Sequence, residues 1–216
     1  LGEDGVLVEF GSGSSVKTEL LLAQAAPGIT YVPVDVSRSA LSEAVARLSA
    51  RFPQLDMRPV VGDFSKSITL PQALDGRPAV GFFPGSTIGN FEPRDAADLL
   101  HAFGRGLPPS SRLVVGVDLK KDARILVRAY NDSKGVTAAF NLNLLRRINR
   151  ELGADFDLGR FRHVALYVPR FGRIEMHLES TALQEVRLLG RRFRFAAGES
   201  IHTENSHKFT IAEFQG

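Results

Sequence analysis

The sequence contains no cysteine, and this absence excludes disulfide bonds, thiolate metal sites and a cysteine nucleophile. It leaves the redox compartment open. No apolar run approaches the roughly 20 residues that a membrane-spanning helix needs. The start, Leu1-Gly2-Glu3-Asp4-Gly5, resembles neither a signal peptide nor a natural initiator. We therefore expect a soluble cytoplasmic protein.

Basic residues are not clustered as in a nucleic-acid-binding surface, although the net charge is +3 and the pI is near 9.4. The two densest basic runs, residues 146–150 and 191–194, are interpreted as solvated faces of a helix and a strand. The histidines of the second half are His163, His177, His202 and His207. None has the spacing of a metal site. We expect a small-molecule substrate and no nucleic acid, membrane or metal partner.

The first 120 residues alternate between short buried-strand patterns and helical patterns. Strands are expected at residues 6–10, 30–35, 57–61, 79–83 and 112–119. Helices are expected at residues 16–26, 40–52 and 93–103, with Ser37 as the N-cap of the second. Strands separated by helices of this length predict right-handed crossovers and a parallel, doubly wound α/β sheet of the Rossmann-like type.

After Asp118 the pattern changes and predicts an inserted α+β module. Helical patterns cover residues 121–130 and 137–152, and the second stops at Gly153. That helix carries one apolar stripe, made of Phe140, Leu144, Ile148 and Leu152. From residue 173 to 180 the apolar side chains alternate with polar ones, and further strands at 182–189 and 192–197 predict an antiparallel meander.

These patterns predict three segments: a first domain at 1–120, a substrate-binding insert at 121–208, and the start of a return to the first domain at 209–216. Because we expect residues 209–214 to open a helix just before the sequence stops, we expect a fragment that lacks material at both ends.

The first glycine-rich turn, Gly11-Ser12-Gly13-Ser14-Ser15-Val16-Lys17-Thr18, lies where loops at the carboxyl ends of parallel strands bind ligands. A P-loop would need glycine where Val16 stands, and a dinucleotide fingerprint would need a third glycine. An ordinary tight turn remains an alternative.

Acidic residues end the second and third predicted strands. Asp35 can accept hydrogen bonds from both hydroxyls of a ribose. Asp63 in Gly62-Asp63-Phe64 can accept an adenine amino group, while the Phe64 ring covers the base. Each aspartate alone is also typical of a helix cap or a turn. Together, behind a Gly-Ser-Gly turn, they favour S-adenosylmethionine over NAD.

The loop after the fourth strand, Gly85-Ser86-Thr87-Ile88-Gly89-Asn90-Phe91, lies where a methyltransferase presents its acceptor. The Asn90 amide offers both an acceptor and donors, and can hold a substrate amine with its lone pair aimed at the methyl group. Methyl transfer is an in-line displacement, so alignment supplies most of the catalysis. No protein base is required if the amine binds neutral or loses its proton to water.

Several uncommon motifs together resemble the family of L-histidine Nα-methyltransferases of ergothioneine biosynthesis. These motifs are GSGSSVKT, YVPVDVS, GDF, FFPGSTIGNF, GVDLKKD, AYND, FNLNLLRRINRELGADFD, RIEMHL and TENSHKF. The resemblance runs from about Leu7 to about Phe209. It implies a Rossmann-like enzyme that uses S-adenosylmethionine to trimethylate the α-amine of histidine, releasing S-adenosylhomocysteine.

The resemblance also implies residue roles. In the cofactor site it implies Gly11, Lys17, Asp35, Asp63 and Phe64. Near the acceptor amine it implies a backbone contact from Gly85, a water-mediated contact from Thr87, and direct positioning by Asn90. For the rest of the substrate it implies Tyr130 at the carboxylate, Glu204 and Ser206 at the imidazole, and Met176 as a pocket wall.

Other interpretations of the residues stay open. By pattern alone Met176 is a core residue, Tyr130 a packing residue and Glu204 a surface group. The family also has a further tyrosine near its amino terminus, before this chain begins. The alternatives are methylation of tryptophan or another amino acid, a nucleotide-binding oxidoreductase, or an inactive cofactor-binding module. A monomer is expected.

Overall fold

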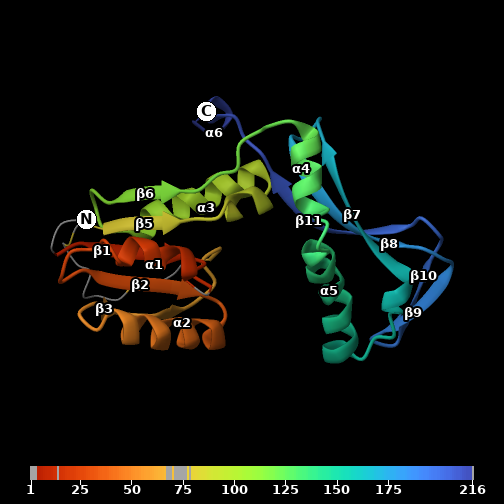
Figure 1. Ribbon diagram of the computed structural model, residues 1–216, viewed down its shortest axis with the longest axis horizontal. Coiled ribbons are helices and arrows are strands. Elements are labelled where there is room, and N and C mark those ends of the chain that lie inside the picture. Colours follow the sequence, from red (N-terminus) through yellow and green to blue (C-terminus); the bar gives the residue numbers. More distant parts are fainter. Residues whose placement is uncertain (1–3, 14, 67–69, 71–76, 78, 216) are drawn as a thin grey trace. The chain divides into compact units, whose positions relative to one another are not determined.

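The chain divides into two compact units, Leu1–Val117 and Asp118–Gly216. The computed structural model describes residues 4–13, 15–66, 70, 77 and 79–215 (Figure 1). Ser14 of the glycine-rich turn and the outermost residues of the predicted domains, 1–3 and 216, lie outside the described residues.

The first unit is built on a parallel sheet, as the sequence predicts. Its strands are β1 (Val6–Phe10), β2 (Thr30–Asp35), β3 (Asp56–Met57), β4 (Val60–Val61), β5 (Ala79–Phe83) and β6 (Arg112–Val115). The order is β3-β2-β1-β5-β6, with β4 also paired to β2, and every pairing is parallel. The crossover helices are α1 (Val16–Leu22), α2 (Arg38–Arg51) and α3 (Pro93–Gly106). This is the doubly wound α/β arrangement.

Both faces of the central strand β1 are buried. Leu7 packs in a cluster with Leu22, Tyr31 and Leu48, which come from α1, β2 and α2. Phe10 lies on the opposite face, and its ring stacks on Phe103 of α3 at 3.8 Å between centroids. Ser37 caps α2 as predicted, accepting a hydrogen bond from the Ala40 amide at 3.3 Å.

Five predicted elements of this unit have different bounds in the structure; α2 and α3 differ by at most three residues at an end, and the other three differ as follows. The strand expected at 57–61 is two short pieces, β3 and β4. Pro59 lies between them, and proline has no N–H to donate to the ladder. The fifth strand ends at Val115, and the Gly116 amide makes one further bond to β5, donating to the Phe83 carbonyl at 2.9 Å. The first helix ends at Leu22, four residues early.

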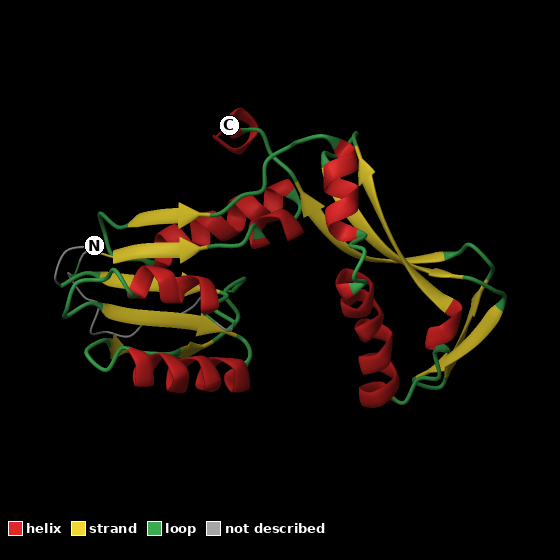
Figure 2. Cartoon of the chain, viewed as in Figure 1, coloured by secondary structure: helices red, strands yellow, loops and turns green. Residues whose placement is uncertain are grey.

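The second unit pairs helices with an antiparallel sheet. Its helices are α4 (Ala123–Tyr130), α5 (Val136–Leu152) and α6 (Ile211–Gln215). Its strands are β7 (Phe161–Val168), β8 (Arg173–Ser180), β9 (Gln184–Leu188), β10 (Arg191–Phe195) and β11 (Ser200–His207). The sheet has the order β11-β8-β7, and β9 and β10 form a separate hairpin (Figure 2). Helices α4 and α5 pack on the face that carries Ile174, Met176 and Leu178.

Two expectations for this unit were wrong. The strands do not form a meander, since β11, which was not predicted, returns to pair with β8 beyond the β9–β10 hairpin. The stripe on α5 is not its buried face: Phe140 is 65% exposed, while Asn141 and Leu145 are buried. Both basic runs are solvated as expected, with Arg146, Arg147 and Arg150 exposed on α5 and all three arginines of 191–194 exposed on β10.

Within the described ranges, no helix combines the length and apolar character needed to cross a membrane.

Candidate functional site

The turn after β1 is tied to the end of β2 by the Asp35 carboxylate. Asp35 Oδ2 accepts from the Gly13 amide at 2.7 Å, and Oδ1 accepts from the Ser37 amide at 2.8 Å. The Gly11 and Ser12 amides both donate to the Val34 carbonyl. Each carboxylate oxygen has two acceptor sites, so one site per oxygen remains for a ligand. The Asp35 carboxylate, which we predict to bind the ribose, is therefore held in one orientation before the cofactor binds.

The same turn requires glycine and contains an unpartnered hydroxyl. Gly11 has a φ of +69°, and a methyl group there would lie 3.1 Å from the Phe64 ring. Within the described part of the chain, the buried Ser12 Oγ has no hydrogen-bond partner. A buried hydroxyl without a partner is costly, and a polar ligand at this turn would supply one.

The Gly62-Asp63-Phe64 turn lies next to this region, because the Gly62 amide donates to the Asp35 carbonyl at 3.0 Å. Asp63 accepts from the Ser65 hydroxyl at 2.6 Å and the Ser65 amide at 3.0 Å, and these bonds lower its pKa. Phe64 packs against Phe83 and Phe103 with centroid distances of 5.6 and 6.1 Å. The aromatic cluster thus fixes the ring that we predict beside the adenine.

The acceptor loop follows β5 and brings three predicted residues together. Ser86 adopts the left-handed conformation and precedes a 3-10 helix, Thr87–Asn90, which ends on the predicted amine-positioning residue. A methyl group on Gly85 would lie 3.1 Å from Lys17 Nζ and 3.9 Å from Thr87 Oγ1. Gly85 also has a φ of +81°, so a side chain there would be strained as well as crowded. Asn90 is exposed.

In the second unit, Tyr130 and Ser206 meet although 76 residues separate them: their hydroxyl oxygens are 2.8 Å apart. The neighbours of Tyr130 have structural roles. Asn131 bonds both the amide and the carbonyl of Ala165 on β7, and Asp132 accepts from the Val136 and Thr137 amides at the start of α5. Those backbone bonds lower the pKa of Asp132 to about 2. They fix the end of α4 and so place the Tyr130 side chain.

Glu204 reaches the helix side of the sheet because of a β-bulge. His202 pairs with His177, but after an irregularity at Thr203 the partner of Glu204 is Met176 and that of Ser206 is Ile174. Paired residues share a face, so the bulge turns Glu204 and Ser206 to the face of the buried Met176. Glu204 lines a pocket of about 200 Å³ with Phe140, Asn141, Asn143, Leu144, Arg147 and Thr203. Burial raises the Glu204 pKa, and the positive charge of Lys208 opposes that shift.

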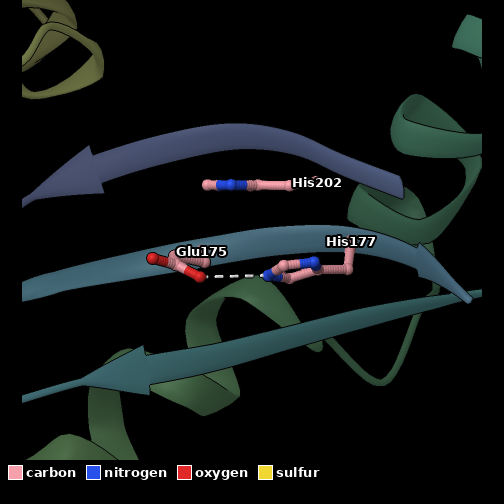
Figure 3. Close-up of side chains that lie close together, drawn as sticks. All are labelled: Glu175, His177 and His202. Atoms are coloured by element: carbon pink, nitrogen blue, oxygen red, sulfur yellow. Dashed lines mark hydrogen bonds and ion pairs between the residues drawn. The ribbon is translucent and has the colours of Figure 1, made fainter. Parts of the chain in front are cut away.

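The opposite face of this sheet gathers Glu175, His177 and His202, whose ligand-type atoms lie within 4.8 Å of one another (Figure 3). Arg173 donates to Glu175 Oε1 at 2.7 Å, and His177 Nε2 lies 3.2 Å from Glu175 Oε2. Burial raises the pKa of Glu175, but the bonds from Arg173 and His177 outweigh it and the net shift is downward. The two imidazoles are stacked at 4.7 Å, so their in-plane lone pairs point side by side, not to one centre. We interpret Arg173, Glu175 and His177 as a chain of polar contacts on this face, with the His202 ring stacked beside it.

Sequence reasoning missed two buried charged residues beside the predicted sites. Glu9, 2% exposed in the middle of β1, accepts hydrogen bonds from the hydroxyls of Thr18 and Tyr31, and burial raises its pKa. The position of Glu9 within an otherwise apolar strand could have indicated that this carboxylate is buried. Lys208 donates to Tyr130 and Ser206. Nothing local in the sequence marks Lys208 as buried.

Comparisons with known proteins agree with this geometry. The profile of the family described as histidine-specific, SAM-dependent methyltransferases matches residues 1–216. The histidine N-alpha-methyltransferases of Mycolicibacterium smegmatis and Mycobacterium tuberculosis are each 44% identical over 94% of this chain and 64% of their own length. Ergothioneine biosynthesis protein 1 of Neurospora crassa is 31% identical over 76% of this chain and 19% of its length.

A parallel sheet with a glycine turn and strand-end carboxylates is the arrangement found in many nucleotide-binding α/β proteins. With the match along its whole length, the chain belongs to the family of histidine-specific, SAM-dependent methyltransferases. It spans about two thirds (64%) of the length of the two mycobacterial relatives.

Proposed function

We propose that this protein transfers methyl groups from S-adenosylmethionine to the α-amine of L-histidine, giving Nα,Nα,Nα-trimethylhistidine (hercynine) for ergothioneine biosynthesis. The observation that carries the proposal is the family match over residues 1–216, together with 44% identity to two histidine N-alpha-methyltransferases. The proposed substrate is a small molecule, and the proposed enzyme is a cytoplasmic monomer. Residues 1–120 would serve the cofactor, residues 121–208 the substrate, and residues 209–216 the return to the first domain.

The described residues of the first unit fit the cofactor. Asp35 keeps one acceptor site on each oxygen for the ribose hydroxyls, and Ser12 Oγ is a buried hydroxyl in need of a partner. We assign Gly11 and Lys17 to the same site, and Asp63 with Phe64 to the adenine. When bound, S-adenosylmethionine supplies a methyl group activated by the adjacent positively charged sulfur.

The acceptor loop is proposed to hold the amine. Asn90 ends a short 3-10 helix, which fixes the position of its backbone, and the carbonyl oxygen of its exposed side chain can accept an N–H of a neutral amine. Thr87 would act through a water, and the Gly85 backbone would lie close by. Because only a neutral amine has a lone pair, these residues must bind that form or let the proton leave to water. Fixed orientation then supplies most of the rate acceleration.

Residues of the second unit are proposed to recognise the amino acid. The Tyr130 hydroxyl would bind the carboxylate, and Glu204 and Ser206 would bind the imidazole, with Met176 as an apolar wall. The chemistry of the Glu204 pocket supports this: an imidazole has apolar faces and an N–H, and Phe140 and Leu144 line the pocket beside the carboxylate.

Mass spectrometry of the full-length protein incubated with S-adenosylmethionine and each of the twenty amino acids tests the proposal. We expect mono-, di- and trimethylated histidine, and their loss in Asn90→Ala with retained S-adenosylhomocysteine binding. Methylation of tryptophan or another amino acid in place of histidine would overturn the substrate assignment. Cofactor binding without any methylated product would indicate an inactive binding module, and NADH binding without S-adenosylmethionine binding would indicate an oxidoreductase.

A further inference from the structure

Lys208 is a buried cation in the middle of the predicted substrate-binding residues. It follows β11 directly, and its backbone amide donates to the Gly172 carbonyl at 2.8 Å. Its side chain is 1% exposed. The Nζ atom donates to Ser206 Oγ at 2.7 Å and to Tyr130 Oη at 2.9 Å, and lies 3.2 Å from Asp118 Oδ2. An ammonium has three N–H groups and no acceptor, so these three partners use all of them.

This arrangement decides the direction of the hydrogen bonds around Tyr130 and Ser206. Both hydroxyl oxygens accept from Lys208, so neither can donate to it. The two hydroxyls carry two protons, and the bond between them uses one, whichever of them donates. Across the part of the chain that the structure describes, the second proton has no acceptor. The pair must therefore present one O–H donor to whatever binds beside it.

The contacts of Lys208 favour an anionic acceptor. Asp118 is paired with two cations, Lys208 at 3.2 Å and Lys121 at 2.7 Å, and the Lys208 charge also acts on Glu204. Because the Lys208 ammonium donates directly to both hydroxyl oxygens, it polarises the O–H that the pair presents and strengthens it as a donor to an anion. Burial raises the pKa of Asp118, but the bonds and charges of the two lysines outweigh it and lower the pKa. Lys208 also lies 4.8 Å from the centroid of the Tyr130 ring. A neutral residue at 208 would remove both the positive charge and the constraint on the two hydroxyls.

We infer that Lys208 is a positioning residue that, with Ser206 donating to Tyr130, holds the Tyr130 hydroxyl as a hydrogen-bond donor for the carboxylate of the amino-acid substrate. It acts through the two hydroxyls and does not itself touch the substrate. The inference rests on the proposed function and deepens it, because it explains how a phenol can bind an anion while the Ser206 oxygen stays available to the imidazole.

The test is a pair of single substitutions and their combination in the full-length protein. Lys208→Met keeps much of the side-chain length and removes the donors and the charge. We expect KM for histidine to rise about tenfold or more, with a smaller change in kcat, because the lost interaction is made with the bound substrate before and during the reaction. The Kd for S-adenosylhomocysteine should stay within about twofold. Tyr130→Phe should raise KM similarly.

The combination separates a positioning role from a structural one. If Lys208 acts through the Tyr130 hydroxyl, adding Lys208→Met to Tyr130→Phe should raise KM much less than it does alone. If the increase in KM of the double variant equals the product of the increases in the two single variants, the inference is overturned. An unchanged KM in Lys208→Met would also overturn it, as would a loss of S-adenosylhomocysteine affinity as large as the increase in KM for histidine.

A second variant guards against misfolding, since removal of Lys208 leaves Asp118 without its buried partner. The combination Asp118→Asn with Lys208→Met removes both charges, and Asp118→Asn alone is its control. If the single variant unfolds, the same KM comparison is made between these two. A wild-type protein that methylates no histidine would overturn the proposed function and this inference together. Wild-type activity with an unchanged KM in the variants would overturn the inference alone.

Discussion

The Asp35 carboxylate gives the sharpest test of the cofactor site, because it holds the turn in the structure and we also propose that it binds the ribose. It accepts from the Gly13 and Ser37 amides at 2.7 and 2.8 Å, and its remaining acceptor sites are predicted to bind ribose. Asp35→Ala removes both the bonds to the two backbone amides and the proposed bonds to the ribose. Asparagine is not a conservative choice here, since its NH₂ group would face one of the two backbone N–H donors.

The loss of the two bonds to backbone amides determines the expected loss of stability. Two backbone N–H groups lose a charged acceptor, but Asp35 is only partly buried, so water can replace part of each bond. We expect the free energy of unfolding to fall by about 1–3 kcal/mol in total. The loss of the proposed bonds to the ribose determines the expected loss of affinity. Two charge-assisted bonds contribute about 1.5 kcal/mol each at the low end, which together correspond to about a hundredfold increase in Kd.

Calorimetry with S-adenosylhomocysteine and thermal unfolding measure the two quantities on the same protein. Ser37→Ala is the matched control, because it removes the side-chain cap of α2 in the same turn and leaves the carboxylate. It should cost about 0.5–2 kcal/mol of stability and leave Kd unchanged. The reasoning would be refuted if folded Asp35→Ala bound S-adenosylhomocysteine as tightly as wild type. The reasoning would also be refuted if Ser37→Ala weakened S-adenosylhomocysteine binding as much as Asp35→Ala does.

Three further predictions concern Glu204, the substrate amine and Glu9. Glu204→Ala should lower kcat/KM for histidine about tenfold or more, because a buried imidazole N–H without an acceptor costs about 1–3 kcal/mol. Adding Met176→Val should shift relative activity toward tryptophan. An undiminished kcat/KM for histidine in Glu204→Ala would reject the imidazole-binding role of Glu204. The rate at subsaturating histidine should rise from pH 7 to about 9, since the α-amine is mostly protonated at neutral pH; a flat profile measured with chemistry limiting would contradict uptake of the neutral amine from solution. Glu9 has a pKa raised above 4.5 by burial, so its contribution to stability is complete below that pH and is lost as the pH rises through the folded-state pKa. The unfolding free energy of wild type, measured relative to Glu9→Gln, should therefore fall as the pH rises above 4.5. A difference independent of pH would show that Glu9 does not titrate as argued.

The sequence by itself determined the architecture of the first unit. Strand and helix patterns there are local, and their alternation leaves few ways to form a parallel sheet. It also placed the turn at Gly11 and the carboxylates Asp35 and Asp63 at strand ends, because the carboxyl ends of parallel strands share one edge. The roles of Tyr130, Glu204 and Ser206 came only from the family resemblance.

Only the tertiary structure decided which side chains are buried and what they contact in the second unit. The α5 stripe was correctly periodic, yet the buried residues are Asn141 and Leu145 on another face. The Asn141 amide donates to the His177 carbonyl at 3.1 Å and lies 2.9 Å from His163 Nδ1. Periodicity shows that a helix has faces but does not say which one the sheet covers. Likewise, β11 is polar along most of its length, so no apolar alternation announced it.

The bulge at Thr203 shows most directly why the sequence alone did not predict which polar side chains of the second unit meet. A strand without it would place residues 202, 204 and 206 on one face, whereas the structure places His202 opposite to Glu204 and Ser206. A one-residue shift in pairing depends on hydrogen bonds to β8, which lies more than 20 residues away along the chain. Lys208 is buried for the same kind of reason, since its three partners come from Asp118, Tyr130 and Ser206. Local sequence specifies elements, but long-range pairing specifies which polar groups meet.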